Sequence, residues 1–221
     1  MKPKKLINTK WCGNLAYALG LLTTDGSLSK DGRHFDFTSK DKELIKLFAK
    51  CLGLQNTIGK KTSGFTGRKD CLHIQFGDIN FYRWCLIFGL MPNKSKTLKG
   101  LKVPNKYFFD FLRGCFDGDG SIYAYWDPRW HSSYMFYIQF CSASQDFIRW
   151  LKKRVDHLLG QRGEIIDIST SRVWQLRYAK KDSLIVFKKM FHTKNLPHLK
   201  RKFLKANKIF KIENKHNSLP R

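Results

Sequence analysis

The sequence lacks several features that define other classes of protein. Its 6 cysteines include no Cys-x-x-Cys pair of the kind that binds zinc or performs redox chemistry. Its longest apolar run covers residues 15–22, which is far too short to span a bilayer. Lysines near the N-terminus precede no apolar segment of the signal-peptide type. These absences predict an intracellular protein with buried, reduced thiols and no membrane partner, and they do not distinguish a bacterial, phage or organellar origin.

Acidic residues are scarce. The chain has 42 Lys and Arg against 17 Asp and Glu, which gives a net charge of +25. Residues 1–105 hold 19 basic and 7 acidic residues, and residues 106–221 hold 23 and 10. An excess spread so evenly would repel itself in a compact fold, and it favours a long polyanion that both halves contact. Nucleic acid is therefore the best candidate for the partner, ahead of a membrane surface.

One pattern is present twice. Residues 112–120 read LRGCFDGDG and residues 18–26 read ALGLLTTDG, each at the end of an apolar, helix-like segment. Asp25 corresponds to Asp119, and each is followed by glycine and serine. Each pattern predicts a helix that stops at an acidic corner and continues directly into a strand.

Small residues support a contact between the two predicted helices. Gly20 and Thr24 are four residues apart, as are Gly114 and Gly118, so each pair lies on one helix face. Small side chains let two helix axes approach more closely than usual. We therefore expect Asp25 to lie beside the corresponding aspartate at the ends of two packed helices.

The two segments resemble the nine-residue motif of the LAGLIDADG homing endonucleases of the single-chain, two-motif type. The first copy departs from that motif at Thr23, where the family prefers aspartate. The resemblance implies an α+β fold in which residues 1–104 and 105–221 form two pseudo-symmetric α-β-β-α-β-β-α halves of one compact unit. Each half would supply a saddle-shaped antiparallel sheet, and the motif helices would pack at the centre. Within this order, Ser39 is expected to cap the helix over residues 41–52 and Gly53 to end it.

The paired carboxylates predict a site for divalent metal. Mg²⁺ prefers oxygen ligands and commonly takes one or two protein carboxylates. The resemblance implies two or more such ions held by Asp25, Asp119 and the backbone carbonyls of Thr24 and Gly118, with Ca²⁺ supporting DNA binding without cleavage.

The resemblance also implies a basic catalytic residue after the third helix of each half. Lys94 and Lys200 are the expected pair, with Lys96 and Lys202 as close rivals. A cation at this place would stabilise charge that develops on a phosphate during cleavage.

Strand and loop residues with polar, aromatic or basic side chains are expected to contact DNA, because a two-stranded ribbon fits the major groove. They are Ser27, Ser29, Arg33, Arg68, Gln75, Tyr123, Tyr125, Arg129, Gln139, Arg172, Gln175 and Arg177.

The resemblance implies a monomeric endonuclease that cuts both strands of a long asymmetric DNA site and leaves short 3′ overhangs. The alternative is a maturase, which binds the RNA of its own intron and assists splicing, with or without cleavage. A DNA-binding regulator without nuclease activity is disfavoured because both acids are present.

Overall fold

The structure is a computed structural model that describes residues 6–62, 67, 70–130, 133–168 and 170–217. The first half of the chain forms, in order, α1 (Gly13–Thr24), β1 (Gly26–Leu28), β2 (His34–Ser39), α2 (Lys42–Leu52), β3 (Ile58–Lys61), β4 (Cys71–Gly77) and α3 (Ile79–Phe88). The second half forms a 3-10 turn (Asn105–Tyr107), α4 (Phe108–Gly118), β5 (Ser121–Trp126), β6 (Tyr134–Ser142), α5 (Gln145–Leu159), β7 (Glu164–Ile168), β8 (Val173–Ala179), α6 (Lys180–Met190) and α7 (Lys200–Asn217).

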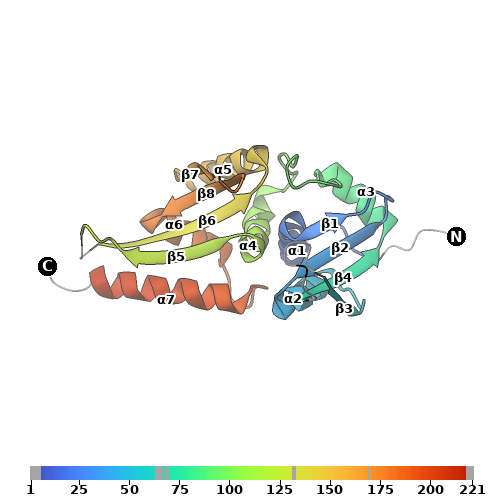
Figure 1. Cartoon of the computed structure of the whole chain (residues 1–221), viewed down its shortest axis with the longest axis horizontal. Helices are drawn as coiled ribbons and strands as arrows, with labels where there is room; N and C mark the ends of the chain where they lie inside the picture. The colour runs from blue at the N-terminus through green and yellow to red at the C-terminus, as the bar shows by residue number, and fades with distance from the viewer. Residues whose placement is uncertain (1–5, 63–66, 68–69, 131–132, 169, 218–221) are drawn as a thin grey trace.

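Each half forms an antiparallel sheet, and the two sheets have the same topology (Figure 1). The strand order is β1-β2-β4-β3 in the first half and β5-β6-β8-β7 in the second. Helix α2 packs on β2 and β4, and α5 and α6 pack on β6 and β8. The fold is therefore α+β with two pseudo-symmetric halves, as predicted.

Alternation along the strands separates a buried face from an outward face in each sheet. In β2, Phe35 and Phe37 are buried, and in β6 the same holds for Phe136 and Ile138. Because successive side chains of a strand point to opposite faces, their neighbours lie on the outward face. Among the described residues, the outward faces therefore consist of half-buried or exposed side chains.

Helices α1 and α4 pack against each other between the two sheets (Figure 1). A Cβ atom built on Gly20 would lie 2.2 Å from the carbonyl oxygen of Phe111. A Cβ atom on Gly114 would lie 2.1 Å from the carbonyl oxygen of Tyr17. Neither position has room for a side chain, so the predicted close packing on the glycine face is confirmed.

Helix α2 shows how local sequence sets the ends of an element. Its side-chain cap is Asp41, which accepts a hydrogen bond from the backbone N–H of Glu43 at 3.1 Å. The expectation that Ser39 caps this helix is wrong, because Ser39 still pairs with Leu72 in the sheet. Gly53 ends the helix as expected, since its φ of 68° lies in the left-handed region that favours glycine.

Two further expectations concern the burial of the cysteines and the lack of a membrane-spanning helix. Cys71, Cys85 and Cys115 are buried free thiols as predicted, whereas Cys12 is exposed. In the part of the chain that the structure describes, no helix has the length and apolar character needed to cross a membrane.

Candidate functional site

The two acidic corners have the same backbone conformation. Asp25 follows α1 with φ −94° and ψ −3°, and Asp119 follows α4 with φ −93° and ψ −2°. The corners also touch, since a Cβ atom on Gly118 would lie 2.0 Å from Thr24 Oγ1 and 2.9 Å from Asp25 Oδ2. The close packing of α1 and α4 thus brings the two aspartates together at the helix ends.

The electrostatics of the corner follow from this proximity. Burial, and after it the negative charge of Asp119, raise the pKa of Asp25 to about 7, whereas Lys202 and Lys94 oppose the shift. Burial also raises the pKa of Asp119, again against the two lysines. Without a cation between them, the carboxylates are therefore costly to ionise together.

Two buried lysines complete the corner in a symmetric way. Lys94 Nζ donates to the carbonyl oxygen of Gly26 at 2.5 Å, and Lys202 Nζ donates to that of Gly120 at 2.6 Å. Each lysine therefore binds the glycine that directly follows an acid. Burial lowers the pKa of each lysine to about 8, and the charges of the aspartates oppose this shift.

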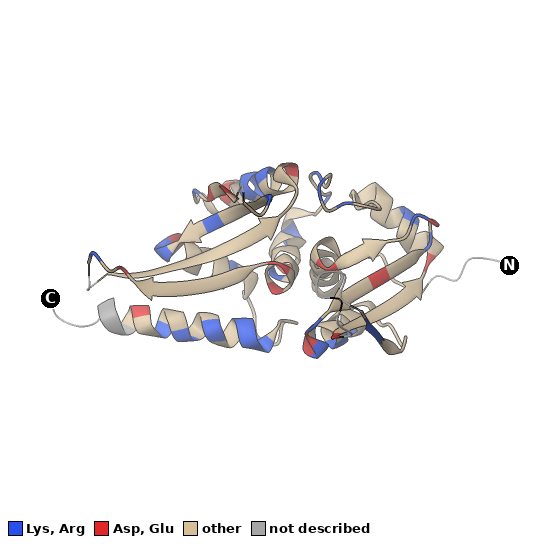
Figure 2. Ribbon diagram, in the orientation of Figure 1, with Lys and Arg blue, Asp and Glu red and all other residues tan. Residues whose placement is uncertain are grey.

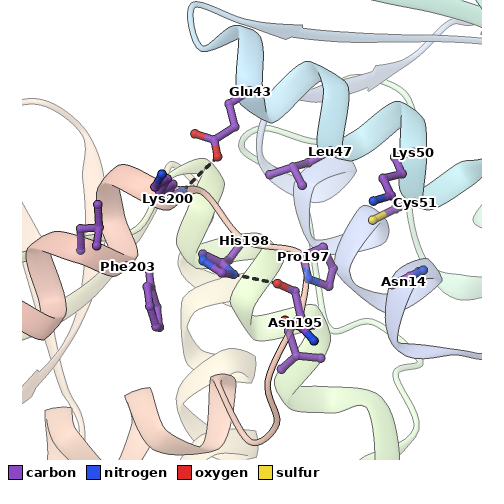
Figure 3. A pocket seen from close by; sticks show the side chains of 12 residues that line it. Asn14, Glu43, Leu47, Lys50, Cys51, Asn195, Pro197, His198, Lys200 and Phe203 are labelled. Carbon is purple, nitrogen blue, oxygen red and sulfur yellow. Dashed lines mark hydrogen bonds between the residues drawn. The ribbon is translucent and has the colours of Figure 1, made fainter.

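The structure separates the candidate lysines. Lys202 is 8% exposed and also donates to the carbonyls of Phe116, Asp117 and Gly118, at the end of α4. Lys200 is exposed, and its backbone N–H faces Glu43 at the edge of a pocket that neither acid lines (Figure 3). Lys94 is 6% exposed, whereas Lys96 is exposed. Lys202, not the expected Lys200, therefore corresponds to Lys94.

Helical periodicity in the sequence carries a signal for Lys202. One face of α7 and the preceding Leu199 pack inward, and the helix contributes the mostly buried apolar residues Phe203, Ala206, Ile209 and Phe210. Lys202 lies three residues after Leu199 and four before Ala206, so it shares their face. A lysine in an apolar stripe points its charge inward, whereas Lys200 lies on the basic face.

The donor atoms fit a hard divalent cation. Asp25 and Asp119 present carboxylate oxygens at adjoining helix ends, and Mg²⁺ commonly uses no more than two protein carboxylates. Among the described residues, no three His, Cys, Asp or Glu side chains come together as a metal cluster. The Gly118 carbonyl, an expected ligand, already accepts a hydrogen bond from Lys202 at 2.9 Å but retains a second lone pair. The Thr24 hydroxyl donates to the carbonyl oxygen of Leu21 at 2.9 Å.

The outward sheet faces gather several of the predicted DNA-contacting residues. In the first sheet, Ser27, Asp36 and Gln75 form one row across three strands. Asp36 also contacts His73 at 3.1 Å and pairs with Lys61. The Ser27 row lines a shallow hollow together with Ser29 and His34. This face is polar and carries an acid at its centre.

The second sheet is aromatic on its outward face. Tyr123 and Tyr137 stack with ring centroids 5.3 Å apart, and Tyr125 stacks on Tyr137 at 6.2 Å. The Arg177 guanidinium lies 4.8 Å from the centre of the Tyr137 ring and pairs with Glu164 at 2.8 Å. Gln139 and Gln175 occupy the same face by register.

The predicted loop arginines lie in different surroundings. Arg33 and Arg172 lie in the turns before β2 and β8, and Arg172 has a positive φ of 52°. Arg129 is paired with Asp127 at 2.9 Å. Arg68 lies outside the described residues.

Comparisons with known proteins bear on the fold. The sequence matches no protein-family model. The uncharacterized protein MJ0314 of Methanocaldococcus jannaschii is 27% identical over 128 residues, which are 55% of this chain and 46% of that protein. The chain thus spans about half the length of this curated relative.

Several solved structures are similar over most of the chain. The I-LtrWI LAGLIDADG homing endonuclease bound to target DNA is 16% identical, with 92% of this chain and 91% of that chain covered and a TM-score of 0.61. Full-length DUF199/WhiA from Thermatoga maritima is 14% identical, with 98% and 66% covered and a TM-score of 0.60. A variant of the homing endonuclease I-DmoI, in complex with its target DNA and Mg, is 14% identical, with 82% and 97% covered and a TM-score of 0.53. The chain therefore has the LAGLIDADG fold.

Proposed function

We propose that this chain is a site-specific homing endonuclease, which hydrolyses both strands of a long asymmetric DNA duplex with divalent metal and leaves short 3′ overhangs. One observation carries the proposal: two aspartates with the same backbone conformation adjoin, each beside a buried lysine that binds the next glycine. A merely structural pair of helix ends would have no need of two buried lysines beside the paired carboxylates, because burial of each ammonium charge is costly.

The roles follow from the chemistry of these side chains. Asp25 and Asp119 would hold Mg²⁺ through their carboxylates, with the carbonyls of Thr24 and Gly118 as further ligands. The bound metal would activate water and stabilise the leaving oxygen. Lys94 and Lys202 would keep positive charge at the scissile phosphates, where negative charge develops.

DNA would lie along the outward sheet faces. The net charge of +25 favours a polyanion, and Arg177 lies on the outward face of the second sheet. Figure 2 shows that Lys and Arg also recur along α5 and α7, which pack on the buried side of that sheet. The polar face around Gln75 and the tyrosine face around Arg177 differ in chemistry, which suits a target whose two half-sites differ in sequence. A single chain supplies both halves, so we propose that a monomer acts, with the boundary between halves at residues 104 and 105.

The test is cleavage by purified variants on a target found by screening a duplex library. Asp25→Asn and Asp119→Asn should each abolish double-strand cleavage in Mg²⁺, because each removes a metal ligand. Their effects should not add, since both acids act as one site. Asp70→Asn is the matched control, because Asp70 is a surface residue paired with Lys40.

Binding in Ca²⁺ separates a lost reaction from a lost interface. Both site variants should bind the target at least as tightly as the wild-type protein, because a negative charge near the phosphates is removed. Full activity of Asp119→Asn would refute the proposal. Inactivity on every duplex, combined with metal-independent binding to structured intron RNA, would favour the maturase instead.

A further inference from the structure

Asp117 lies behind the acidic corner, two residues before Asp119, and is 1% exposed. Its Oδ2 accepts two hydrogen bonds from distant parts of the chain: from Tyr17 OH at 2.7 Å and from the backbone N–H of Leu199 at 2.8 Å. Tyr17 belongs to α1 in the first half, and Leu199 directly precedes α7. A single carboxylate oxygen therefore joins three segments.

Leu199 caps the first turn of α7 from the position just before the helix. Its carbonyl accepts from the N–H of Lys202 at 3.1 Å and from that of Phe203 at 3.2 Å, so it closes the first turn of the helix. Lys202 then returns to the segment that contains Asp117, where its Nζ binds the Asp117 carbonyl at 2.8 Å. The turn from Leu199 to Lys202 is thus held at both ends by α4.

The first half has no equivalent of this arrangement at the matching position. Thr23 corresponds to Asp117, and its hydroxyl donates to the carbonyl oxygen of Leu19, in its own helix, at 2.7 Å. Lys94 therefore reaches Gly26 without a tether from position 23. The difference between the halves gives an internal comparison for what Asp117 does.

We propose that Asp117 is a positioning residue, which holds the start of α7 so that Lys202 reaches the Asp119 corner. The proposal rests on the endonuclease function proposed above. Because the twofold relation of the halves matches that of the two DNA strands, each lysine faces one scissile phosphate. Loss of the hydrogen bond from Leu199 to Asp117 should consequently slow cleavage of one DNA strand more than cleavage of the other.

The central variant is Asp117→Thr, which installs the residue that the first half uses and whose hydroxyl can bind its own helix. Asp117→Asn retains an acceptor oxygen for Leu199 and is the conservative rescue. Tyr17→Phe removes the other donor and leaves the bond to Leu199 in place.

The first measurement needs neither metal nor DNA. Amide hydrogen exchange by NMR should accelerate about tenfold or more at Leu199 and Phe203 in Asp117→Thr, relative to Phe210 later in α7. Asp117→Asn and Tyr17→Phe should keep the wild-type ratio. Unchanged protection in Asp117→Thr would overturn the tether even if the wild-type protein cleaves no DNA.

The second measurement is the rate of nicking of each strand. Asp117→Thr should slow one strand about tenfold more than the other, so that nicked duplex accumulates. The same strand should be slowed by Lys202→Met, and the double variant should be little slower than Lys202→Met alone. The effects of Asp117→Thr and Lys94→Met on the nicking rates should add when the two substitutions are combined. Equal slowing of both strands, or additivity with Lys202→Met, would assign Asp117 a general structural role and overturn the inference.

Discussion

Replacement of Asp25 by asparagine should stabilise the metal-free protein, by an amount that depends on pH. Burial and the Asp119 charge raise the pKa of Asp25 from 3.8 to about 7 in the folded protein. Between these values the folded state binds more protons than the unfolded state, so stability falls as pH rises from about 4 to 7 and is then level. At about 1.36 kcal/mol per pKa unit, the ionised Asp25 costs up to about 4 kcal/mol above pH 7.

Asparagine carries no charge at any of these pH values and removes this cost. Asp25→Asn should therefore match the wild-type protein at pH 4 and exceed its free energy of unfolding by up to about 4 kcal/mol at pH 8. Urea unfolding in EDTA at pH 4, 6 and 8 measures the difference. Asp70→Asn should show the opposite sign, because Lys40 lowers the pKa of Asp70 in the folded protein. A constant difference between wild type and Asp25→Asn across this range would refute the reasoning.

Magnesium should reverse the advantage of the variant. A cation between the carboxylates offsets their repulsion and stabilises the folded state by RT ln(1 + [Mg²⁺]/Kd). Added Mg²⁺ should therefore raise the stability of the wild-type protein at pH 8 more than that of Asp25→Asn. The effect should be smaller at pH 5, where protons compete for Asp25.

Three further predictions concern the helix pair, the lysines and the interface. Gly114→Ala should lower the free energy of unfolding by about 3 kcal/mol or more, because its Cβ atom would overlap the backbone of α1, whereas Gly13→Ala should be near neutral in the same urea assay. Lys202→Met should slow DNA cleavage about tenfold or more, and the exposed Lys200→Met should change it less than about twofold in single-turnover assays. Target affinity should fall linearly with log salt, with a slope of about −0.9 for each phosphate neutralised, and a flat titration would exclude an extended basic interface.

The parts of the structure that were predictable follow from local chemistry that occurs twice. Asp25 and Asp119 each follow an apolar segment and precede glycine, so a helix end and a strand start were both expected there. Gly20 and Gly114 indicated the helix contact because a glycine at the same place on both helix faces lets the two backbones approach closely. These features depend on residues within one or two turns of each other, which is the range over which sequence patterns are informative.

Side-chain contacts between distant segments were harder to predict from the sequence. Asp117 and Thr23 occupy the same position of the repeated pattern, and that pattern predicted no distant partner for either residue. The structure shows that Asp117 binds Leu199, 82 residues away, whereas Thr23 binds its own helix. No local pattern near Asp117 encodes this partner, because the partner is a backbone N–H that any residue could supply.

The lysines show why the two halves cannot be aligned by position alone. Lys94 follows Asp25 by 69 residues, whereas Lys202 follows Asp119 by 83. The paths to the two lysines differ, since a direct turn leads from α3 to Lys94, while residues 191–199 connect α6 to α7. Both paths nevertheless end with a buried ammonium group on the glycine after the acid. The common end point on unequal paths indicates that the position of the charge, rather than the length of the connection, is what the two halves share.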